Sequence, residues 1–179
     1  MSVQAVGRRS VLDIAAEVLV ADPSASLAEV AFAAGIGRTT LHKQYATRDD
    51  LMRAVGHRAL DLWEQAIDGV EENDDGGLRA FVAAMVPIGP QLAFLWRTPL
   101  FDHIEDINRR WRSAEQRGLA VLHRARALGI ITADVPDWWL LQTFHSLVYV
   151  AAESVRHGDL APRGAPDLVV STFLKGLGR

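Results

Sequence analysis

The stretch that decides the fold spans residues 26–51 and reads SLAEVAFAAGIGRTTLHKQYATRDDL. Ser26 with Glu29 three residues later is a capping box, in which the serine hydroxyl accepts from a backbone N–H and the glutamate reaches back to the cap residue. Gly35 suits the left-handed end of the helix that starts there. Thr47 with Asp50 forms a second capping box. The stretch therefore predicts two short helices, joined by a turn around residues 36–37, and a longer helix from residue 48.

The second short helix holds the basic excess of the chain. The whole chain has 19 Lys+Arg, 22 Asp+Glu and a formal net charge of -3, which argues against a protein that coats nucleic acid with a uniformly basic surface. Between Gly35 and Arg58, however, five basic residues accompany only two acids, Asp49 and Asp50. Two short helices with a basic second member indicate a helix-turn-helix, whose second helix enters the major groove of DNA.

Helical spacing of apolar residues recurs along the rest of the chain, so we expect an all-α protein. Asp22-Pro23 stops a first helix, and the acidic run 71–77 with its Gly-Gly pair predicts a break. Pro87 and Pro90 interrupt a helix that spans residues 78–96. The stretch 137–156 is apolar on nearly every side, which predicts a helix buried all round.

Composition excludes several classes of protein. Hydrophobic residues make up 49% of the 179 residues, charged residues 23%, and there is no cysteine. Disulfides, zinc ribbons and thiolate chemistry are therefore excluded. Residues 1–9 lack the apolar region of a signal peptide, and no uncharged stretch reaches the roughly 20 residues of a spanning helix. We expect a cytoplasmic protein with no membrane segment.

Nothing in the sequence predicts an enzyme, because no catalytic constellation, phosphate loop or cysteine nucleophile is present. A few acids and histidines raise the question of a metal site: Asp102, His103, Glu105, Asp106 and His123. Their spacing is not that of metal ligands, and a solvated acidic face explains them better. We assign no metal and no cofactor.

The N-terminal quarter resembles the tetracycline-repressor (TetR) family of transcriptional regulators. Val11–Ala16 is similar to the first helix of that family, Ser26–Ala31 with Ala34-Gly35-Ile36 to the second, and Thr40–Tyr45 to the recognition helix. Arg48-Asp49-Asp50-Leu51 resembles the Lys-Glu-x-Leu start of helix four. His42 departs from the pattern, because it stands where the family usually has a phosphate-contacting tyrosine, and Gly37 takes a position often held by serine.

The resemblance implies an all-α fold in two parts. Residues 1–56 would form a three-helix DNA-binding domain with the helix-turn-helix, and residues 57–179 a helical domain for effector binding and dimerisation. The helix that starts at residue 48 would link them. The function implied is that of a regulator, a repressor by analogy, on the duplex DNA of a palindromic operator. The residues expected at the DNA are Ser26, Arg38, Thr39, Thr40, His42, Lys43 and Arg48.

A small apolar or amphipathic effector is expected in the C-terminal part, because that part is rich in aromatic residues and poor in uncharged polar ones. The kink at Pro87 and Pro90 favours a cavity, since broken helices pack less completely. The candidate effector residues are Phe81, Met85, Trp96, Phe101, Trp111, Trp139, Phe144 and His145, each of which also fits a plain core role. Residues 137–156 and 167–177 carry more apolar surface than one small domain covers, which predicts a homodimer through the last two helices.

A different class of function stays open at this stage. The chain would then be a helical ligand-binding or scaffold protein that no longer binds an operator. His42 and the near-neutral charge of the N-terminal part are compatible with it. Selection of bound sequences from random duplex DNA separates the two hypotheses.

Overall fold

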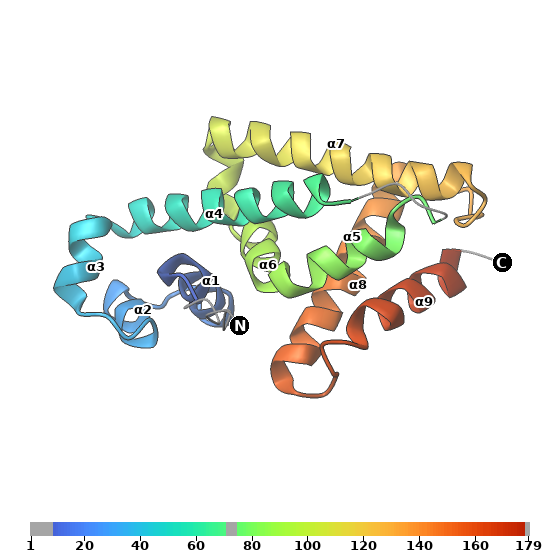
Figure 1. The fold of residues 1–179 in the computed structure, drawn as a ribbon. Coiled ribbons are helices and arrows are strands. Elements are labelled where there is room, and N and C mark those ends of the chain that lie inside the picture. The colour runs from blue at the N-terminus through green and yellow to red at the C-terminus, as the bar shows by residue number, and fades with distance from the viewer. Residues whose placement is uncertain (1–8, 71–74, 178–179) are drawn as a thin grey trace, which may run out of the picture.

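A computed structural model describes residues 9–70 and 75–177 of the chain, and these ranges are helical with no strand (Figure 1). The expected all-α fold is confirmed. The α-helices are α1 (Val11–Ala21), α2 (Leu27–Ala33), α3 (Arg38–Gln44), α4 (Arg48–Asp68), α5 (Leu78–Met85), α6 (Gly89–Arg97), α7 (Glu105–Ala127), α8 (Asp137–His157) and α9 (Ala165–Leu177). Two short 3₁₀ helices join them, η1 (Val86–Ile88) and η2 (Pro99–His103). Of the predicted break at residues 71–77, positions 71–74 lie outside the described residues.

Local signals in the sequence set the first four helices. Both predicted capping boxes form, Ser26 with Glu29 at α2 and Thr47 with Asp50 at α4. Gly35 takes the left-handed conformation, with a φ of 65°, between α2 and α3. These caps satisfy backbone groups that the starts of α2 and α4 leave unpaired, so α2 is fixed at its start although it has only seven residues. α3 also has seven residues, and its N-cap makes no side-chain hydrogen bond.

The two prolines break the apolar stretch after residue 77 as expected. The chain passes from α5 through η1 into α6, with Pro87 in η1 and Pro90 near the start of α6. By length and composition the stretch Leu78–Arg97 is long and apolar enough to cross a membrane, but 61% of its most apolar window is buried inside the protein. Burial of this kind is what a core segment shows.

Figure 1 shows α1, α2 and α3 gathered around the first half of α4, with α5 to α9 around its second half. α4 is continuous across residue 56, so the expected boundary there falls inside a helix. α6 lies at the centre and packs against α1, α4 and α8. α7 packs along α4, and α8 packs against α9. The arrangement leaves α4 and α6 as the connections between the two parts of the fold.

α8 corrects one prediction from the sequence. Its side facing the core is buried, with Leu140, Phe144 and Val148 at 0% exposure. Trp138 and Val150, however, are 71% and 57% exposed, so burial all round is wrong for the single chain. The other helices leave this side of α8 uncovered, and Leu168 of α9 is exposed as well.

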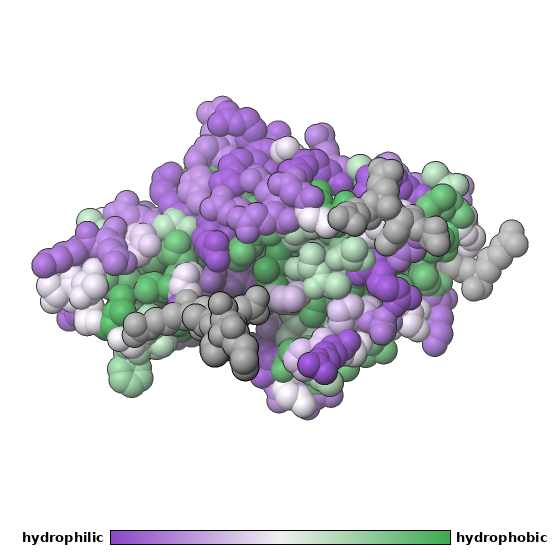
Figure 2. Space-filling view, viewed as in Figure 1, coloured by the Kyte–Doolittle hydropathy of each residue, from purple (hydrophilic) through white to green (hydrophobic). Residues whose placement is uncertain are grey.

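The surface over α7 differs from that side of α8. Figure 2 shows it as mainly hydrophilic, and the exposed residues of α7 include Arg109, Arg112 and Gln116. The buried side of α7 carries Ile107, Val121 and Leu122. α7 therefore has the single apolar stripe of an outer helix.

α6 and α8 pack so closely at Gly89 that adding one methyl group there tests the contact. A Cβ built on Gly89 would lie 2.1 Å from Cβ of Ala152. Gly89→Ala should therefore lower the free energy of unfolding by roughly 1–3 kcal/mol, the usual cost of overpacking. Urea unfolding measures the change.

Two further variants control this prediction. Ala152→Gly in the same chain should recover part of the loss, because it removes the opposing methyl group. Gly176→Ala in α9 should cause no loss, since nothing lies within 4 Å of its added Cβ. An unchanged unfolding midpoint for Gly89→Ala would contradict the packing of α6 on α8.

Candidate DNA-binding surface and effector cavity

α3 presents an outward face that is anchored from behind by one side chain. Leu41 is 0% exposed and packs into the core below α3. The predicted contact residues Arg38, Thr39, Thr40, His42 and Lys43 are all exposed. Gly37 at the N-cap offers no side-chain hydrogen bond, so the first N–H groups of α3 have no side-chain partner there. A helix with free N–H groups and basic side chains suits phosphate contacts.

Ser26 is placed at the start of α2, where its groups are committed to the capping box. Its backbone N–H donates to Oε2 of Glu29 at 2.7 Å, and its hydroxyl donates to the same oxygen at 2.8 Å. The backbone hydrogen bond from Ser26, together with the hydroxyl, lowers the pKa of the Glu29 carboxyl below its ordinary value. Ser26 therefore fixes the helix that supports α3.

The structure places Arg48 differently from the other predicted DNA residues. Its guanidinium donates to the backbone carbonyl oxygens of Pro23 and Ala25, in the loop between α1 and α2. These bonds tie the start of α4 to that loop. We therefore expect Arg48 to position the helix-turn-helix. Its guanidinium is hydrogen-bonded to carbonyl groups and is not directed at a DNA phosphate.

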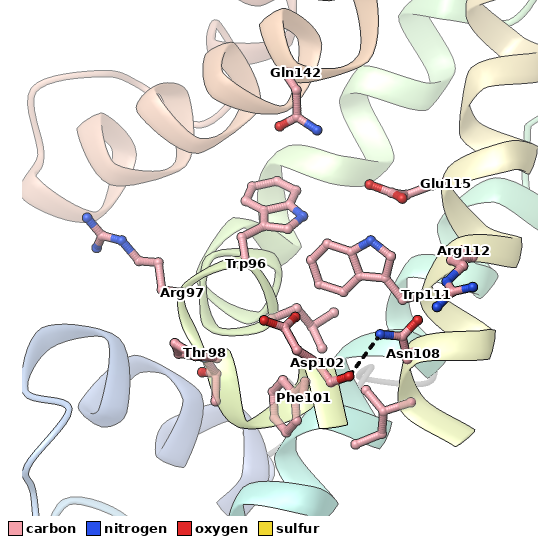
Figure 3. A pocket seen from close by; sticks show the side chains of 13 residues that line it. Trp96, Arg97, Thr98, Phe101, Asp102, Asn108, Trp111, Arg112, Glu115 and Gln142 are labelled. Atoms are coloured by element: carbon pink, nitrogen blue, oxygen red, sulfur yellow. Dashed lines mark hydrogen bonds between the residues drawn. The ribbon is translucent and has the colours of Figure 1, made fainter. Parts of the chain in front are cut away.

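A cavity of about 490 Å³ lies between α6, η2, α7 and α8. Figure 3 shows the indole rings of Trp96 and Trp111 facing each other across it, with Gln142 above and Phe101 below. Polar groups on the wall include the carboxyl groups of Asp102 and Glu115, the amide of Asn108 and that of Gln142. The cavity is thus aromatic with a few placed polar groups, the usual character of a small-molecule site.

Glu115 is the residue of this cavity that sequence reasoning missed. Burial raises the pKa of its carboxyl above the ordinary value, and the hydrogen bond from the Trp111 side chain acts in the opposite direction. Among the described residues it makes no ion pair. The available signal was its position four residues after Trp111, which places both side chains on one face of α7.

Two cations line the cavity, Arg97 and Arg112, and neither makes an ion pair with this carboxyl group in the described part of the chain. Arg97 points away from the cavity in Figure 3 and stacks on the ring of Tyr149 at 5.3 Å. The half-buried carboxyl group of Glu115 and the two indoles therefore give the cavity the chemistry that attracts an aromatic cation.

The predicted effector residues divide into three groups. Trp96, Phe101 and Trp111 line the cavity. Phe81, Met85 and Phe144 lie at 0% exposure in the core, where Phe81 and Phe144 stack with centroids 4.9 Å apart. Trp139 is 54% exposed on the outer surface of α8.

His145 lies behind the cavity wall, in a cluster of aromatic rings. Its ring lies 4.7 Å from that of Trp96 and 5.5 Å from that of Trp63, which in turn meets Trp111 edge-on at 5.7 Å. Burial lowers the pKa of His145 to about 3, so the imidazole is neutral at pH 7. The cluster joins the cavity residues of α6 and α7 to Trp63 of α4.

A second cavity of about 560 Å³ lies at the junction of α1, α4 and the end of α6. Leu19 of α1, Met52 of α4 and Phe94 of α6 belong to its wall. Arg97, Thr98 and Pro99 line both cavities. The segment 97–99 is therefore a wall shared by the aromatic cavity and the base of the helix-turn-helix.

Ion pairs hold α4 against α7 on the hydrophilic side. The guanidinium of Arg110 donates to Asp61 at 2.6 Å and to Glu64 at 2.8 Å, and Arg117 pairs with Asp68. Hydrogen bonds from Arg110 to Glu64 and then Asp61 raise the pKa of the Arg110 guanidinium above its ordinary value. Together these pairs fix the second half of α4 along α7.

Three of the acids and histidines considered for a metal site take part in such pairs. Glu105 pairs with Arg109 at 3.8 Å, Asp106 with His57 at 3.1 Å, and His123 with Asp137 at 2.7 Å. In residues 9–70 and 75–177, no three His, Cys, Asp or Glu side chains are grouped as metal ligands would be.

Comparison with known proteins also indicates a helix-turn-helix regulator. No protein-family model matches it. The chain is 30% identical over 173 residues to the HTH-type transcriptional repressor LfrR of Mycolicibacterium smegmatis, an alignment that covers 95% of this chain and 89% of that protein. It is 28% identical over 168 residues to the HTH-type transcriptional regulator NfxB of Pseudomonas aeruginosa, with 90% and 89% covered.

Solved structures agree with these relatives. The TetR-like regulator LfrR from Mycobacterium smegmatis in complex with proflavine has a TM-score of 0.75 and 28% identity, with 96% of each chain covered. The TetR family regulator PfmR from Thermus thermophilus has a TM-score of 0.64 at 16% identity, with 96% of this chain and 100% of that chain covered, and supports the fold. These proteins are transcriptional regulators and not enzymes.

Two basic residues should respond differently to substitution. Lys43→Ala should weaken binding to every duplex, because it removes an exposed charge. The slope of log affinity against log salt concentration should become shallower by about 0.9, the contribution of one phosphate contact. Arg48→Ala should weaken binding and lower stability by about 1–3 kcal/mol while the salt slope stays the same, because its guanidinium is bonded to carbonyl groups. Anisotropy titrations at several salt concentrations measure both. A lower salt slope for Arg48→Ala would place its charge on a phosphate instead.

The neutral state of His145 predicts how stability depends on pH. Its pKa is about 3 in the folded chain and near 6.5 when the chain unfolds. Between these values the unfolded chain binds a proton that the folded chain does not, so stability falls as the pH drops below about 6.5. The loss is at most roughly 1.4 kcal/mol per pH unit.

Urea unfolding at pH 7.5, 6.5 and 5.5 tests this dependence. His145→Phe keeps an aromatic ring and should remove the decrease in the free energy of unfolding below pH 6.5 that His145 causes. His42→Gln alters an exposed histidine and should leave that decrease unchanged. Equal slopes for the wild type and His145→Phe would contradict the burial of a neutral imidazole.

Proposed function

Because the chain belongs to the TetR family of transcriptional regulators, we propose that it is a homodimeric repressor that an aromatic effector releases from a palindromic operator. The observation that carries the proposal is that one continuous helix joins both sites. α4 begins beside α3 at Arg48, and its second half bears Trp63, which contacts the aromatic wall of the cavity. An occupant of the cavity is thus coupled to the position of α3.

On the DNA side, α3 lies in the major groove of each half-site. Arg38 and Lys43 contact phosphates, and Thr39, Thr40 and His42 lie on the same exposed face toward the bases and backbone. The short side chain of Thr40 and the imidazole of His42 both accept and donate hydrogen bonds. The protein acts where the DNA is, in the cytoplasm.

On the effector side, we propose a planar aromatic cation. Trp96 and Trp111 place two indoles on the cavity wall, and indole rings attract a cationic ring. The carboxyl group of Glu115 supplies the opposite charge. The relative LfrR has been solved with proflavine, a molecule of this class. A cavity of about 490 Å³ accommodates a ring system of that size.

The switch follows from two contacts of the cavity wall. A ring between Trp96 and Trp111 displaces Trp111, which packs on Trp63 of α4. It also moves the segment 97–99, which forms part of the wall at the base of α1 and α4. The effector therefore favours a state in which the two copies of α3 are differently spaced and no longer fit both half-sites.

The homodimer forms through the uncovered sides of α8 and α9. Trp138, Trp139, Val150 and Leu168 are each more than half exposed in the single chain. Large apolar side chains that gather on the surface of two packed helices mark an association site. A two-fold axis there pairs α8 and α9 of one protomer with the same helices of its partner, and this gives the operator its palindromic form.

The function is tested by selecting bound sequences from random duplex DNA and then titrating proflavine into the complex with the selected duplex. We expect one palindromic sequence to be enriched and proflavine to release it. Glu115→Gln should weaken proflavine binding roughly tenfold, because it removes a charge-assisted contact. Glu105→Gln changes an exposed glutamate paired within α7 and should have no effect.

The outcomes separate the two candidate functions. Proflavine binding without enrichment of any duplex would favour a ligand-binding protein that has lost its operator. Enrichment of a duplex that proflavine does not release would contradict the proposed effector class.

Charged substitutions test the proposed dimer surface. Val150→Asp combined with Leu168→Asp places four carboxylates at the proposed interface of the dimer, which should dissociate it and abolish tight operator binding. Light scattering should change from about 40 kDa to about 20 kDa, since one chain has a mass of 19.6 kDa. Leu128→Asp alters an exposed leucine outside α8 and α9 and should leave the dimer intact. A wild-type chain that scatters as a monomer would contradict the interface.

A further inference from the structure

One hydrogen-bond donor on the cavity wall has no partner. Nε1 of Trp96 is buried, and no described group accepts its proton. Buried side-chain atoms without partners also occur in Trp63, Gln91, Arg126 and His145, but none of these residues lines the aromatic cavity. Trp96 is where an unpaired donor and this cavity coincide.

The ring that carries this donor is held in place from behind. The His145 imidazole lies against it with centroids 4.7 Å apart and planes 30° apart, and His145 itself is 3% exposed. In Figure 3 the nitrogen edge of Trp96 faces toward Trp111 and Glu115. The indole therefore directs its N–H toward Trp111 and Glu115, although the nitrogen itself is buried in this structure.

The opposite indole is in a different state. The Trp111 side chain has the Glu115 carboxyl group as a neighbour, and this contact acts to lower the pKa of that carboxyl group against the effect of burial. The two indoles thus differ, since Trp111 lies near a carboxyl group and the Trp96 N–H is a buried donor without a partner. An occupant that provides an acceptor gains a hydrogen bond to this buried donor, and an occupant without an acceptor does not.

We propose that the Trp96 N–H donates a hydrogen bond to a carbonyl oxygen on the effector. The inference rests on the proposed effector site and narrows its ligand class, from aromatic cations in general to aromatic amines that also carry a ring carbonyl substituent. The cationic amine faces Glu115, and the carbonyl oxygen accepts from Nε1 of Trp96. A site built around a hydrogen bond discriminates strongly against an analogue that lacks the matching group.

Access to the Trp96 N–H also connects ligand binding to the movement of α4. Nε1 of Trp96 is buried, and its edge of the ring points toward Trp111 in Figure 3, so we infer that a carbonyl group reaches the N–H when the Trp111 ring moves aside. Trp111 packs edge-on against Trp63 of α4, at 5.7 Å between centroids. Ligands that satisfy Trp96 therefore displace the ring that contacts α4.

Two matched probes test the inference, 9-aminoacridine and its 2-carboxamide, which differ by one carbonyl-bearing group. Calorimetry on the dimeric wild-type chain should show the carboxamide binding about fivefold to tenfold more tightly, the net effect of one hydrogen bond. Trp96→Phe keeps an aromatic face and removes the N–H, so it should bind both probes equally. Trp111→Phe is the matched control, because it weakens both probes alike and retains the preference.

The results distinguish this inference from the function on which it rests. Equal affinities in the wild type, or a preference that persists in Trp96→Phe, would overturn the role of the Trp96 N–H. If both probes nevertheless bind, release the operator and weaken with Glu115→Gln, the proposed effector site stands without it. Failure of both probes to bind would overturn the effector site and the inference together.

Discussion

The packing of one indole, that of Trp63, is the contact on which the rest of the structure depends. Trp63 is 0% exposed and lies on α4. It meets Trp111 of α7 and His145 of α8 edge-on, and His145 stacks on Trp96 of α6. Because a protein interior is packed as densely as a crystal, these rings cannot shift independently. Four helices are therefore linked at the back of the aromatic cavity.

In the proposed switch, α4 carries a displacement of this ring cluster to the DNA-binding helices. Trp63 lies 15 positions after Arg48, which is about 22 Å along the helix axis. At the near end, Thr47 caps the helix and Arg48 ties it to the loop before α2. At the far end, Arg110 and Arg117 pair α4 with α7. A helix fixed to α7 and to the helix-turn-helix transmits a displacement at Trp63 without a flexible element between.

How far the sequence predicts this structure depends on the range of the interactions. The caps at Ser26 and Thr47 and the break at Pro87 and Pro90 were predicted correctly, because they depend on neighbours within four residues. The cavity was harder to predict, since Phe144 and Trp111 follow the same apolar periodicity and only the packing of α7 and α8 in the folded chain separates core from wall. The carbonyl partners of Arg48 depend on contacts that no local pattern contains, and the signal for Glu115 was its spacing of four residues from Trp111.

The central claim is that an occupant of the aromatic cavity moves the recognition helices through α4. The chain contains no cysteine, so Gln44→Cys at the exposed end of α3 gives one labelling site per protomer. Pulsed electron resonance on the spin-labelled dimer then measures the distance between the two copies of α3. Saturating proflavine should shift this distance to a new, narrow distribution. An unchanged distribution at saturation would contradict the account.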